Sequence, residues 1–315
     1  MKILQARPHR SLLLAWALGL MPGWVQAAPA VLSADYHPQI QVISDSSVPA
    51  VSSLLGCPIR KVVASAADPV TGLPQKFSFF RWIPRHPGHY SGKVVMDPPT
   101  GGLTPLDRAM AFALCSKGME VALIETWDGY HEDGVLDFGL HERASLRAIA
   151  AARGVIEYLG TPVGILGTSL GSIYASLTMG ADPRVMAGVF IVGGGPLPEV
   201  LTQSDQSGLV ALRNTRCEQM GICDPAAYQA ELERNISTNP LELADAKRAQ
   251  DIFMVIGTRD KTVPTVNQEQ LWNAWGQPEV VRIDRNHVGT ILEASLTQQG
   301  RIVRFFSRKL QAPEL

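Results

Sequence analysis

The stretch that decides the fold is Val163-Gly164-Ile165-Leu166-Gly167-Thr168-Ser169-Leu170-Gly171. Its apolar run ends in the pattern Gly-x-Ser-x-Gly, and residues 172–177 continue with small and apolar side chains. This order predicts a strand, a sharp turn at Ser169 and then a helix. Glycine is expected at positions 167 and 171 because a side chain at either would collide where the strand and the helix cross.

A serine at such a turn has the features of a nucleophile. Its hydroxyl is held, in a strained backbone conformation, above the edge of the sheet. The backbone N–H of Leu170 is expected at the start of the helix, where unpaired donors and the helix dipole favour negative charge. An exposed hydroxyl beside a site for an oxyanion is the arrangement that acyl transfer requires.

The segments around this stretch alternate between short apolar runs and helical patterns. Because each expected strand is continuously apolar, the pattern indicates an α/β fold with a mostly parallel, doubly wound sheet covered on both faces. Ligands bind such sheets at the carboxyl ends of the strands, where Ser169 lies. The expected strands are 93–96, 119–124, 163–168, 185–192, 251–256 and 279–283.

Two segments depart from this alternation. Residues 28–90 contain strand-like stretches at 39–43 and 76–83, which we expect to form a hairpin or meander at one edge of the sheet. Residues 197–248 contain helical stretches, the last at 240–247, and no strand-like run. We therefore expect a core formed by 28–196 and 249–315, with 197–248 inserted as a helical cap over the strand ends.

A nucleophilic serine needs a base beside it, and the base needs a third group to orient it. Among seven histidines, only His287 follows the last expected strand and precedes the last expected helix, which a Thr290–Glu293 capping box would open. His141, by contrast, is expected to open an earlier helix. Asp260 follows the strand 251–256 and is the expected acid, with Asp128, after an earlier strand, as the alternative.

These motifs resemble those of the α/β-hydrolase superfamily, in particular its serine esterases and lipases. The resemblance covers about 93–315 and consists of Gly-Thr-Ser-Leu-Gly at 167–171, Gly-Thr-Arg-Asp-Lys-Thr-Val-Pro at 257–264 and Asn-His-Val-Gly at 286–289. It implies Ser169 as nucleophile, Asp260 as acid and His287 as general base.

The reaction implied by the resemblance is hydrolysis of a small carboxylic ester, with no cofactor or metal. An acyltransferase or a peptidase would use the same triad, and a non-catalytic binding protein could retain the fold. The residue pattern alone leaves these alternatives open, together with the substrate and the oligomeric state.

The loop expected to complete an oxyanion hole departs from the family pattern. Many members carry His-Gly there, whereas this chain has Asp97-Pro98-Pro99. Proline has no N–H to donate. The first donor is expected to be Leu170, and the second must come from Thr100, Gly101 or Gly102, of which we favour Thr100.

The N-terminus has the pattern of a secretory signal peptide. Lys2, Arg7 and Arg10 precede an apolar run at 11–21 that is too short to span a bilayer, and Val25-Gln26-Ala27 fits a cleavage site. An uncleaved anchor is the alternative. We expect residues 1–27 to be removed and the product to be periplasmic or secreted. About 288 residues would remain, which is enough for one large domain.

Charge and cysteine content narrow the choice of partners. The formal net charge is −1 and there is no basic run, so nucleic acid and anionic membrane surfaces are poor candidate partners. Export permits disulfides, and the six-residue spacing of Cys217 and Cys223 predicts one. Cys57 and Cys115 remain undecided because sequence cannot show whether they meet. No cysteine or histidine spacing resembles a metal site.

Overall fold

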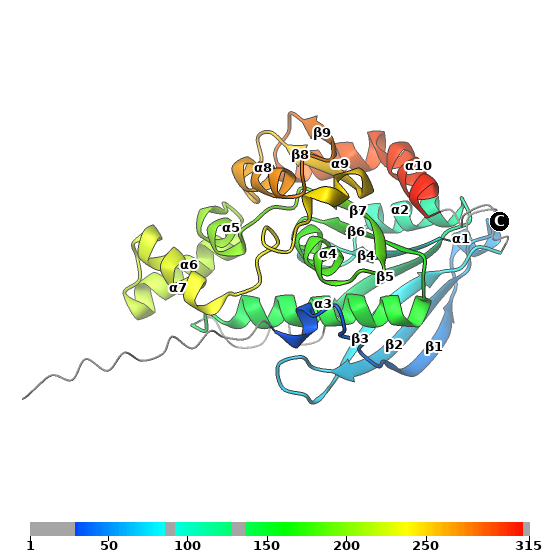
Figure 1. Ribbon diagram of the computed structural model, residues 1–315, viewed down its shortest axis with the longest axis horizontal. Coiled ribbons are helices and arrows are strands. Elements are labelled where there is room, and N and C mark those ends of the chain that lie inside the picture. Colours follow the sequence, from blue (N-terminus) through cyan, green and yellow to red (C-terminus); the bar gives the residue numbers. More distant parts are fainter. Residues whose placement is uncertain (1–28, 86–91, 128–135, 311–315) are drawn as a thin grey trace, which may run out of the picture.

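The computed structural model of the protein describes residues 29–85, 92–127 and 136–310. Within them, nine strands form one sheet in the order β1-β2-β3-β5-β4-β6-β7-β8-β9. From β5 to β9 in this order all neighbours are parallel, whereas β1, β2 and β3 are antiparallel additions at one edge (Figure 1). The strands are β1 (Gln41–Val48), β2 (Ile59–Ala67), β3 (Pro74–Trp82), β4 (Lys93–Asp97), β5 (Glu120–Trp127), β6 (Val163–Thr168), β7 (Val185–Ile191), β8 (Ile252–Gly257) and β9 (Glu279–Ile283).

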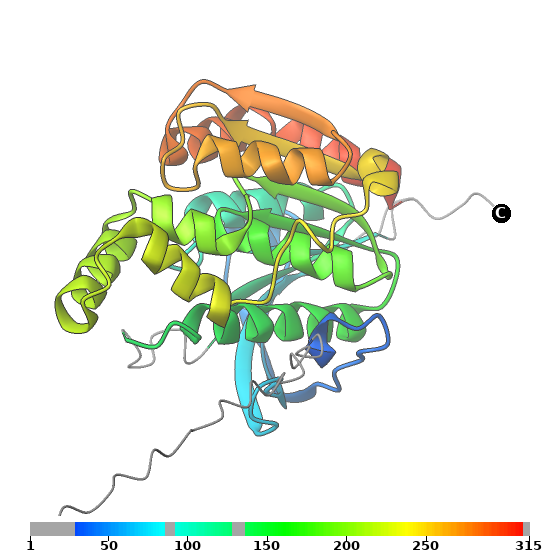
Figure 2. The same ribbon diagram turned by 60° about the vertical axis from the view of Figure 1, so that its left-hand side comes forward.

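Helices cover both faces of the sheet, which confirms the predicted fold class. Apolar side chains of α2, α9 and α10 belong to one buried cluster with the strands, and those of α3, α4 and α8 pack mainly against the opposite face. Figures 1 and 2 show these two layers. The helices named so far are α2 (Pro105–Cys115), α3 (Leu140–Leu159), α4 (Leu170–Ala181), α8 (Thr265–Ala274), α9 (His287–Thr297) and α10 (Gln299–Lys309).

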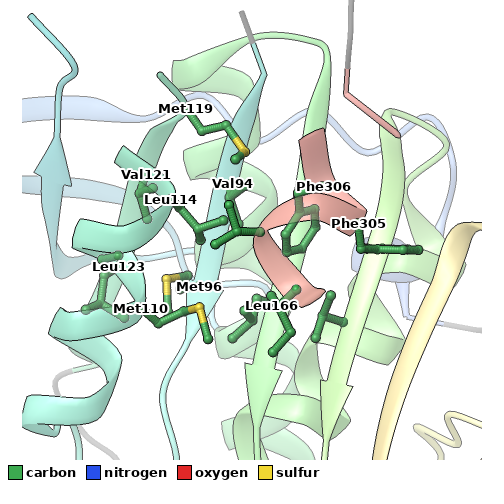
Figure 3. Close-up of a cluster of buried hydrophobic side chains, with 14 of the residues drawn as sticks. Val94, Met96, Met110, Leu114, Met119, Val121, Leu123, Leu166, Phe305 and Phe306 are labelled. Atoms are coloured by element: carbon green, nitrogen blue, oxygen red, sulfur yellow. The ribbon is translucent and has the colours of Figure 1, made fainter. Parts of the chain in front are cut away.

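The side chains between the sheet and the helices α2 and α10 are packed so closely that one strand position has room only for glycine. Val94 and Met96 of β4 lie against Leu114 of α2, and Phe306 of α10 lies on the same cluster (Figure 3). A Cβ added at Gly164 would come within 2.6 Å of the Phe306 ring. Glycine at this position of β6 therefore allows α10 to pack directly on the strand.

The order of the strands places a crevice beside β6. β4 and β6 are neighbours in the sheet although β5 lies between them in the chain. The helices that follow β4 and β5, α2 and α3, consequently cover opposite faces. In an open parallel sheet, such a switch point separates the loops at the carboxyl ends of the strands and forms the usual ligand site.

The antiparallel edge differs from the sequence prediction. Two strands were expected, and within residues 29–85 there are three, with β2 between the other two. Its inward positions include Val62 but also Ala64 and Ala66, whose small side chains give only a weak alternation of hydrophobicity. A four-residue helix, α1 (Val51–Leu54), connects β1 to β2.

A buried arginine fixes the first described residues to the core. Arg153 of α3 is fully buried and donates to the carbonyl oxygens of Val31 and Ser33, both at 2.7 Å, and of Ala34 at 3.3 Å. Its Nε lies 3.2 Å from Oδ2 of the buried Asp182. The short 3₁₀-helix η1 (Ala30–Leu32) is thereby held against α3 and α4.

The inserted segment forms three α-helices, which lie together beyond one end of the sheet (Figure 1). Their apolar side chains pack on α3 and α4. The prediction of a helix at 240–247 was wrong. The chain turns there, and the 3₁₀-helix η2 (Ala246–Asp251) follows. The three helices are α5 (Leu197–Gln203), α6 (Ser207–Met220) and α7 (Pro225–Asn235).

Two disulfides join parts of the fold. Cys217 of α6 is bonded to Cys223, just before α7, and Cys57 is bonded to Cys115 at the end of α2. The second bridge links the antiparallel edge to a helix of the parallel core. None of the helices within the described residues is long and apolar enough to cross a membrane.

The two bridges should contribute unequally to stability, because a cross-link removes more freedom from the unfolded chain when it closes a longer loop. The Cys57→Ala/Cys115→Ala variant opens a separation of 58 residues, and Cys217→Ala/Cys223→Ala opens one of 6. We expect losses of about 4 and about 2 kcal/mol in the free energy of unfolding. Urea titration of both variants and the wild type measures them, and a larger loss for the shorter loop would contradict this account.

Candidate active site

The turn after β6 has the geometry that the sequence indicated. Ser169 is the N-cap of α4 and has φ 57° and ψ −123°, a conformation that non-glycine residues rarely adopt. A Cβ at Gly167 would lie 2.2 Å from the Gly171 carbonyl oxygen, and one at Gly171 would lie 2.3 Å from the carbonyl oxygens of Asp97 and Pro98. Both glycines are therefore required for the close crossing of strand and helix.

The three residues proposed from sequence as a triad lie in one hydrogen-bonded chain. Ser169 Oγ is 2.8 Å from His287 Nε2, and His287 Nδ1 is 2.7 Å from Asp260 Oδ2. They come from the loops after β6 and β8 and from the first turn of α9. Ser169 and Asp260 are buried, and the side chain of His287 is 11% exposed.

Asp260 is held by groups that the sequence did not reveal. Its Oδ1 accepts from the N–H groups of Thr262 (2.9 Å) and Val263 (3.1 Å), and its Oδ2 also accepts from Gln268 Nε2 (2.8 Å). Gln268 is fully buried in α8, and its Oε1 accepts from the N–H of Gly257. The burial of Gln268 is visible only in the folded chain, so the sequence carried no signal for this role.

The start of α9 places His287. The helix begins at His287 itself, and the side chain of its N-cap, Asn286, accepts from the N–H of Gly289 at 2.9 Å. The expected start at a Thr290–Glu293 capping box was wrong, because Glu293 pairs instead with Arg285 (3.0 Å). An early cap brings the imidazole to the end of the sheet rather than leaving it in the preceding loop.

The loop after β4 reduces the choice of oxyanion donors. The N–H of Gly102 donates to the Pro99 carbonyl (3.1 Å) and is therefore engaged in a turn. Of the remaining candidates, Gly101 has φ 99° and Thr100 lines a cavity together with Ser169 and Leu170. Leu170 is the first residue of α4, where N–H groups have no partner within the helix.

A cavity of about 60 Å³ lies beside the Ser169 hydroxyl. Its lining residues include members of α3, α4, α5 and α6. One of them, His141, had no functional role among the expectations from sequence. The cavity is lined by Thr100, His141, Ser169, Leu170, Ile173, Tyr174, Leu197, Val200, Leu201, Gln206, Leu209, Thr262 and Val263.

Two further expectations concern the alternative acid and metal binding. Asp128, the alternative acid, lies outside the described residues. Within the parts of the chain that the structure describes, no group of three or more His, Cys, Asp or Glu side chains could hold a metal ion.

Asp97, at the end of β4, is a carboxyl group without charge partners. Asp97 is 4% exposed, and its Oδ2 has no hydrogen-bond partner among the described residues. In the sheet, Asp97 of β4 lies opposite Gly167 of β6. Burial raises the pKa of Asp97 to about 8. The carboxyl is therefore protonated at neutral pH, directly beside the backbone that carries the turn at Ser169.

Comparison with known proteins identifies the fold. No family model matches the sequence, and no curated protein matches it. Acetyl xylan esterase from Paenibacillus sp. R4 is similar in structure at 17% identity, with 89% of this chain and 92% of that chain covered and a TM-score of 0.64. Acetyl xylan esterase 1 from Thermoanaerobacterium sp. JW/SL YS485 is similar at 15% identity, covering 88% and 90%, with a TM-score of 0.59.

A third similar structure is Est1E from Butyrivibrio proteoclasticus with ferulic acid bound, at 12% identity, covering 76% of this chain and 97% of that chain, with a TM-score of 0.56. At such low identity these similarities concern the fold. The chain has the α/β-hydrolase fold that its motifs indicated.

The neutral state of Asp97 predicts a pH-dependent stability. The unfolded carboxyl ionises above pH 4, whereas the folded one stays protonated up to about pH 8, so the folded state loses stability as the pH rises between these values. Asp97→Asn cannot ionise and should gain stability relative to the wild type over this range, by on the order of 5 kcal/mol at most.

Urea unfolding at pH 4.5 and pH 8 measures this gain. Asp35→Asn, at an exposed position, is the matched control and should follow the wild type at both pH values. An Asp97→Asn variant that also follows the wild type would mean that Asp97 ionises normally in the folded protein.

Proposed function

We propose that the protein is a serine hydrolase that cleaves carboxylic esters through an acyl-enzyme on Ser169. The observation that carries the proposal is the hydrogen-bonded chain from Ser169 Oγ through the His287 imidazole to Asp260. The esterase names of the similar structures support the same reaction class.

In the first half of the reaction, Ser169 Oγ forms a bond to the acyl carbon while its proton moves to His287 Nε2. The carboxylate of Asp260 holds Nδ1–H and stabilises the imidazolium that results. The negative charge on the former carbonyl oxygen is stabilised by the N–H of Leu170 and by a donor from Thr100 or Gly101. The bond to the alcohol oxygen then breaks, and Nε2 returns the proton to that oxygen.

In the second half, water attacks the acyl-enzyme while His287 Nε2 takes its proton. Collapse of this intermediate breaks the bond to Ser169 Oγ, which recovers a proton from the imidazolium, and the carboxylic acid leaves. The same groups act in both halves. If an alcohol replaced water, the product would be a new ester, which is the acyltransferase alternative.

The size of the cavity favours short acyl groups. One water molecule needs about 10–15 Å³ on this measure, so about 60 Å³ holds roughly four to six water-sized groups. Acetyl to butyryl groups are of this size. The acetyl xylan esterase names of two similar structures are consistent with a short acyl chain.

We further propose that residues 197–248 act as a cap that sets the acyl preference, on a core formed by 28–196 and 249–315. Leu197, Val200 and Leu201 of α5 and Leu209 of α6 line the cavity. No residue of the hydrogen-bonded chain belongs to this segment. It would therefore shape the pocket without supplying a group that transfers protons.

The localisation that we propose is outside the cytoplasm, following cleavage after Ala27. Residues 1–28 lie outside the described part of the chain, so the support comes from the disulfides. Both pairs, Cys57–Cys115 and Cys217–Cys223, are joined, which is compatible with an oxidising compartment.

Replacement of Ser169 by alanine tests the proposed reaction. Ser169→Ala should lower kcat for 4-nitrophenyl acetate by a factor on the order of 10⁶, because the residues of a triad act as one unit. The variant should also fail to react with a fluorophosphonate probe, while its circular dichroism spectrum and Tm stay close to those of the wild type. Probe labelling that persists at another serine would overturn the assignment, and a wild type that neither reacts nor labels would indicate a binding protein.

The cap proposal predicts a shift in chain-length preference. Leu209→Ala enlarges the cavity, so kcat/KM for hexanoyl relative to acetyl nitrophenyl esters should rise about tenfold or more. Leu212→Ala, on the same helix but not among the lining residues, is the matched control and should keep the wild-type profile. Equal loss of activity on all chain lengths, with a lowered Tm, would instead assign Leu209 to the packed interior.

A further inference from the structure

The cavity contains a polar side chain that the proposed mechanism does not use. His141, the second residue of α3, lines the cavity together with Ser169 and Thr100. Its Nε2 is buried and has no hydrogen-bond partner among the described residues. Buried polar atoms are almost always paired, with protein or with ordered water, so an unpaired one on a residue that lines a cavity leaves a partner to be supplied by a group bound there.

Burial, together with a nearby positive charge, keeps this imidazole neutral. Arg216 is fully buried, lies 4.1 Å from the centroid of the Phe138 ring, and donates to Tyr228 Oη (2.8 Å) and to the Asp137 carbonyl (2.9 Å). Burial first, and then the charge of Arg216, lower the pKa of His141 to about 4. A neutral imidazole has one N–H donor and one lone-pair acceptor.

A hydroxyl group is the partner that fits both tautomers. It accepts from Nε2 when that atom carries the proton, and it donates to Nε2 when the proton is on Nδ1. An ammonium or a carboxylate would meet an apolar wall formed by Ile173, Leu197, Val200 and Leu201, where a charge is costly to bury. Most of the bound group must therefore be hydrocarbon.

The acyl part of an ester is the part that suits this cavity. In the proposed mechanism the acyl group stays bonded to Ser169 while the alcohol must leave for the solvent. A cavity of about 60 Å³ beside Ser169 Oγ can hold the retained group, including a few carbons and one oxygen.

We propose that His141 Nε2 binds a hydroxyl on the acyl chain, so that the preferred substrates are esters of short hydroxyacids. This inference rests on the proposed function, since it concerns the acyl group held at Ser169. His141 is a specificity-determining residue and takes no part in proton transfer: the proton moves between Ser169 and His287, at 2.8 Å.

The experiment compares two substrates that differ by one hydroxyl, 4-nitrophenyl butyrate and 4-nitrophenyl 3-hydroxybutyrate. The wild type should favour the hydroxylated ester in kcat/KM by about ten- to a hundredfold, the range expected for one buried hydrogen bond. His141→Phe should abolish this preference, because no polar atom remains at position 141 to pair with the hydroxyl.

Two amide variants separate the hydrogen bond from loss of the ring. His141→Gln can place a polar atom near the position of Nε2 and should retain part of the preference, whereas the shorter His141→Asn cannot reach and should lose it. Leu209→Ala changes the same cavity without removing a polar group and should keep the preference. Tm values and circular dichroism spectra identify any variant that does not fold. If His141→Phe does not fold, the comparison of His141→Gln with His141→Asn still tests the proposal.

The inference fails if the wild type does not favour the hydroxylated ester, or if the preference survives in both His141→Phe and His141→Asn. Activity on 4-nitrophenyl acetate separates this failure from that of the proposed function. Hydrolysis of the acetate that depends on Ser169, without a role for His141, overturns only the hydroxyacyl specificity. Absence of Ser169-dependent hydrolysis in the wild type overturns both proposals.

Discussion

The site depends on the close crossing of β6 and α4. Two positions, Gly167 and Gly171, have no room for a Cβ, because backbone atoms of the facing segments would lie within about 2.3 Å of it. This contact forces the positive φ of Ser169 and points the first N–H groups of α4 toward the cavity. It also sets Gly171 against the carbonyls of Asp97 and Pro98, so that the loop after β4 lies beside the turn. The proposed nucleophile and the proposed oxyanion donors are thus positioned by the absence of two side chains.

Features that depend on short sequence patterns could be predicted, and those that depend on packing between distant segments could not. The apolar runs indicated the parallel strands, and the turn at Ser169 followed from its two glycines. Gln268 escaped because only the folded chain shows that it faces Asp260. The start of α9 was harder to predict, because Asn286 and Thr290 are both residue types that favour the N-cap position. In the structure Asn286 is the N-cap, and its side chain accepts from the N–H of Gly289.

Two titratable side chains around Ser169 are uncharged at neutral pH. Burial keeps the carboxyl of Asp97 protonated, and burial with Arg216 keeps His141 neutral. These two polar groups near Ser169 therefore carry no full charge, whereas the Asp260 carboxylate lies behind His287. Hydrogen bonds to a developing oxyanion are stronger in such a low-dielectric environment than in water, and no fixed anion beside the loop after β4 opposes them.

The contact of Arg153 with residues 31–34 also constrains the order of folding. The hydrogen bonds join groups 119–122 residues apart, and the ion pair with Asp182 extends the dependence to the end of α4. Contacts of such separation form only after the intervening chain has been closed into a loop, which is slow and entropically costly. Residues 31–34, which precede α3 and α4 in the chain, are accordingly expected to take up their final position after those helices have formed. The segment around η1 can therefore reach its final position only after α3 and α4 have packed together.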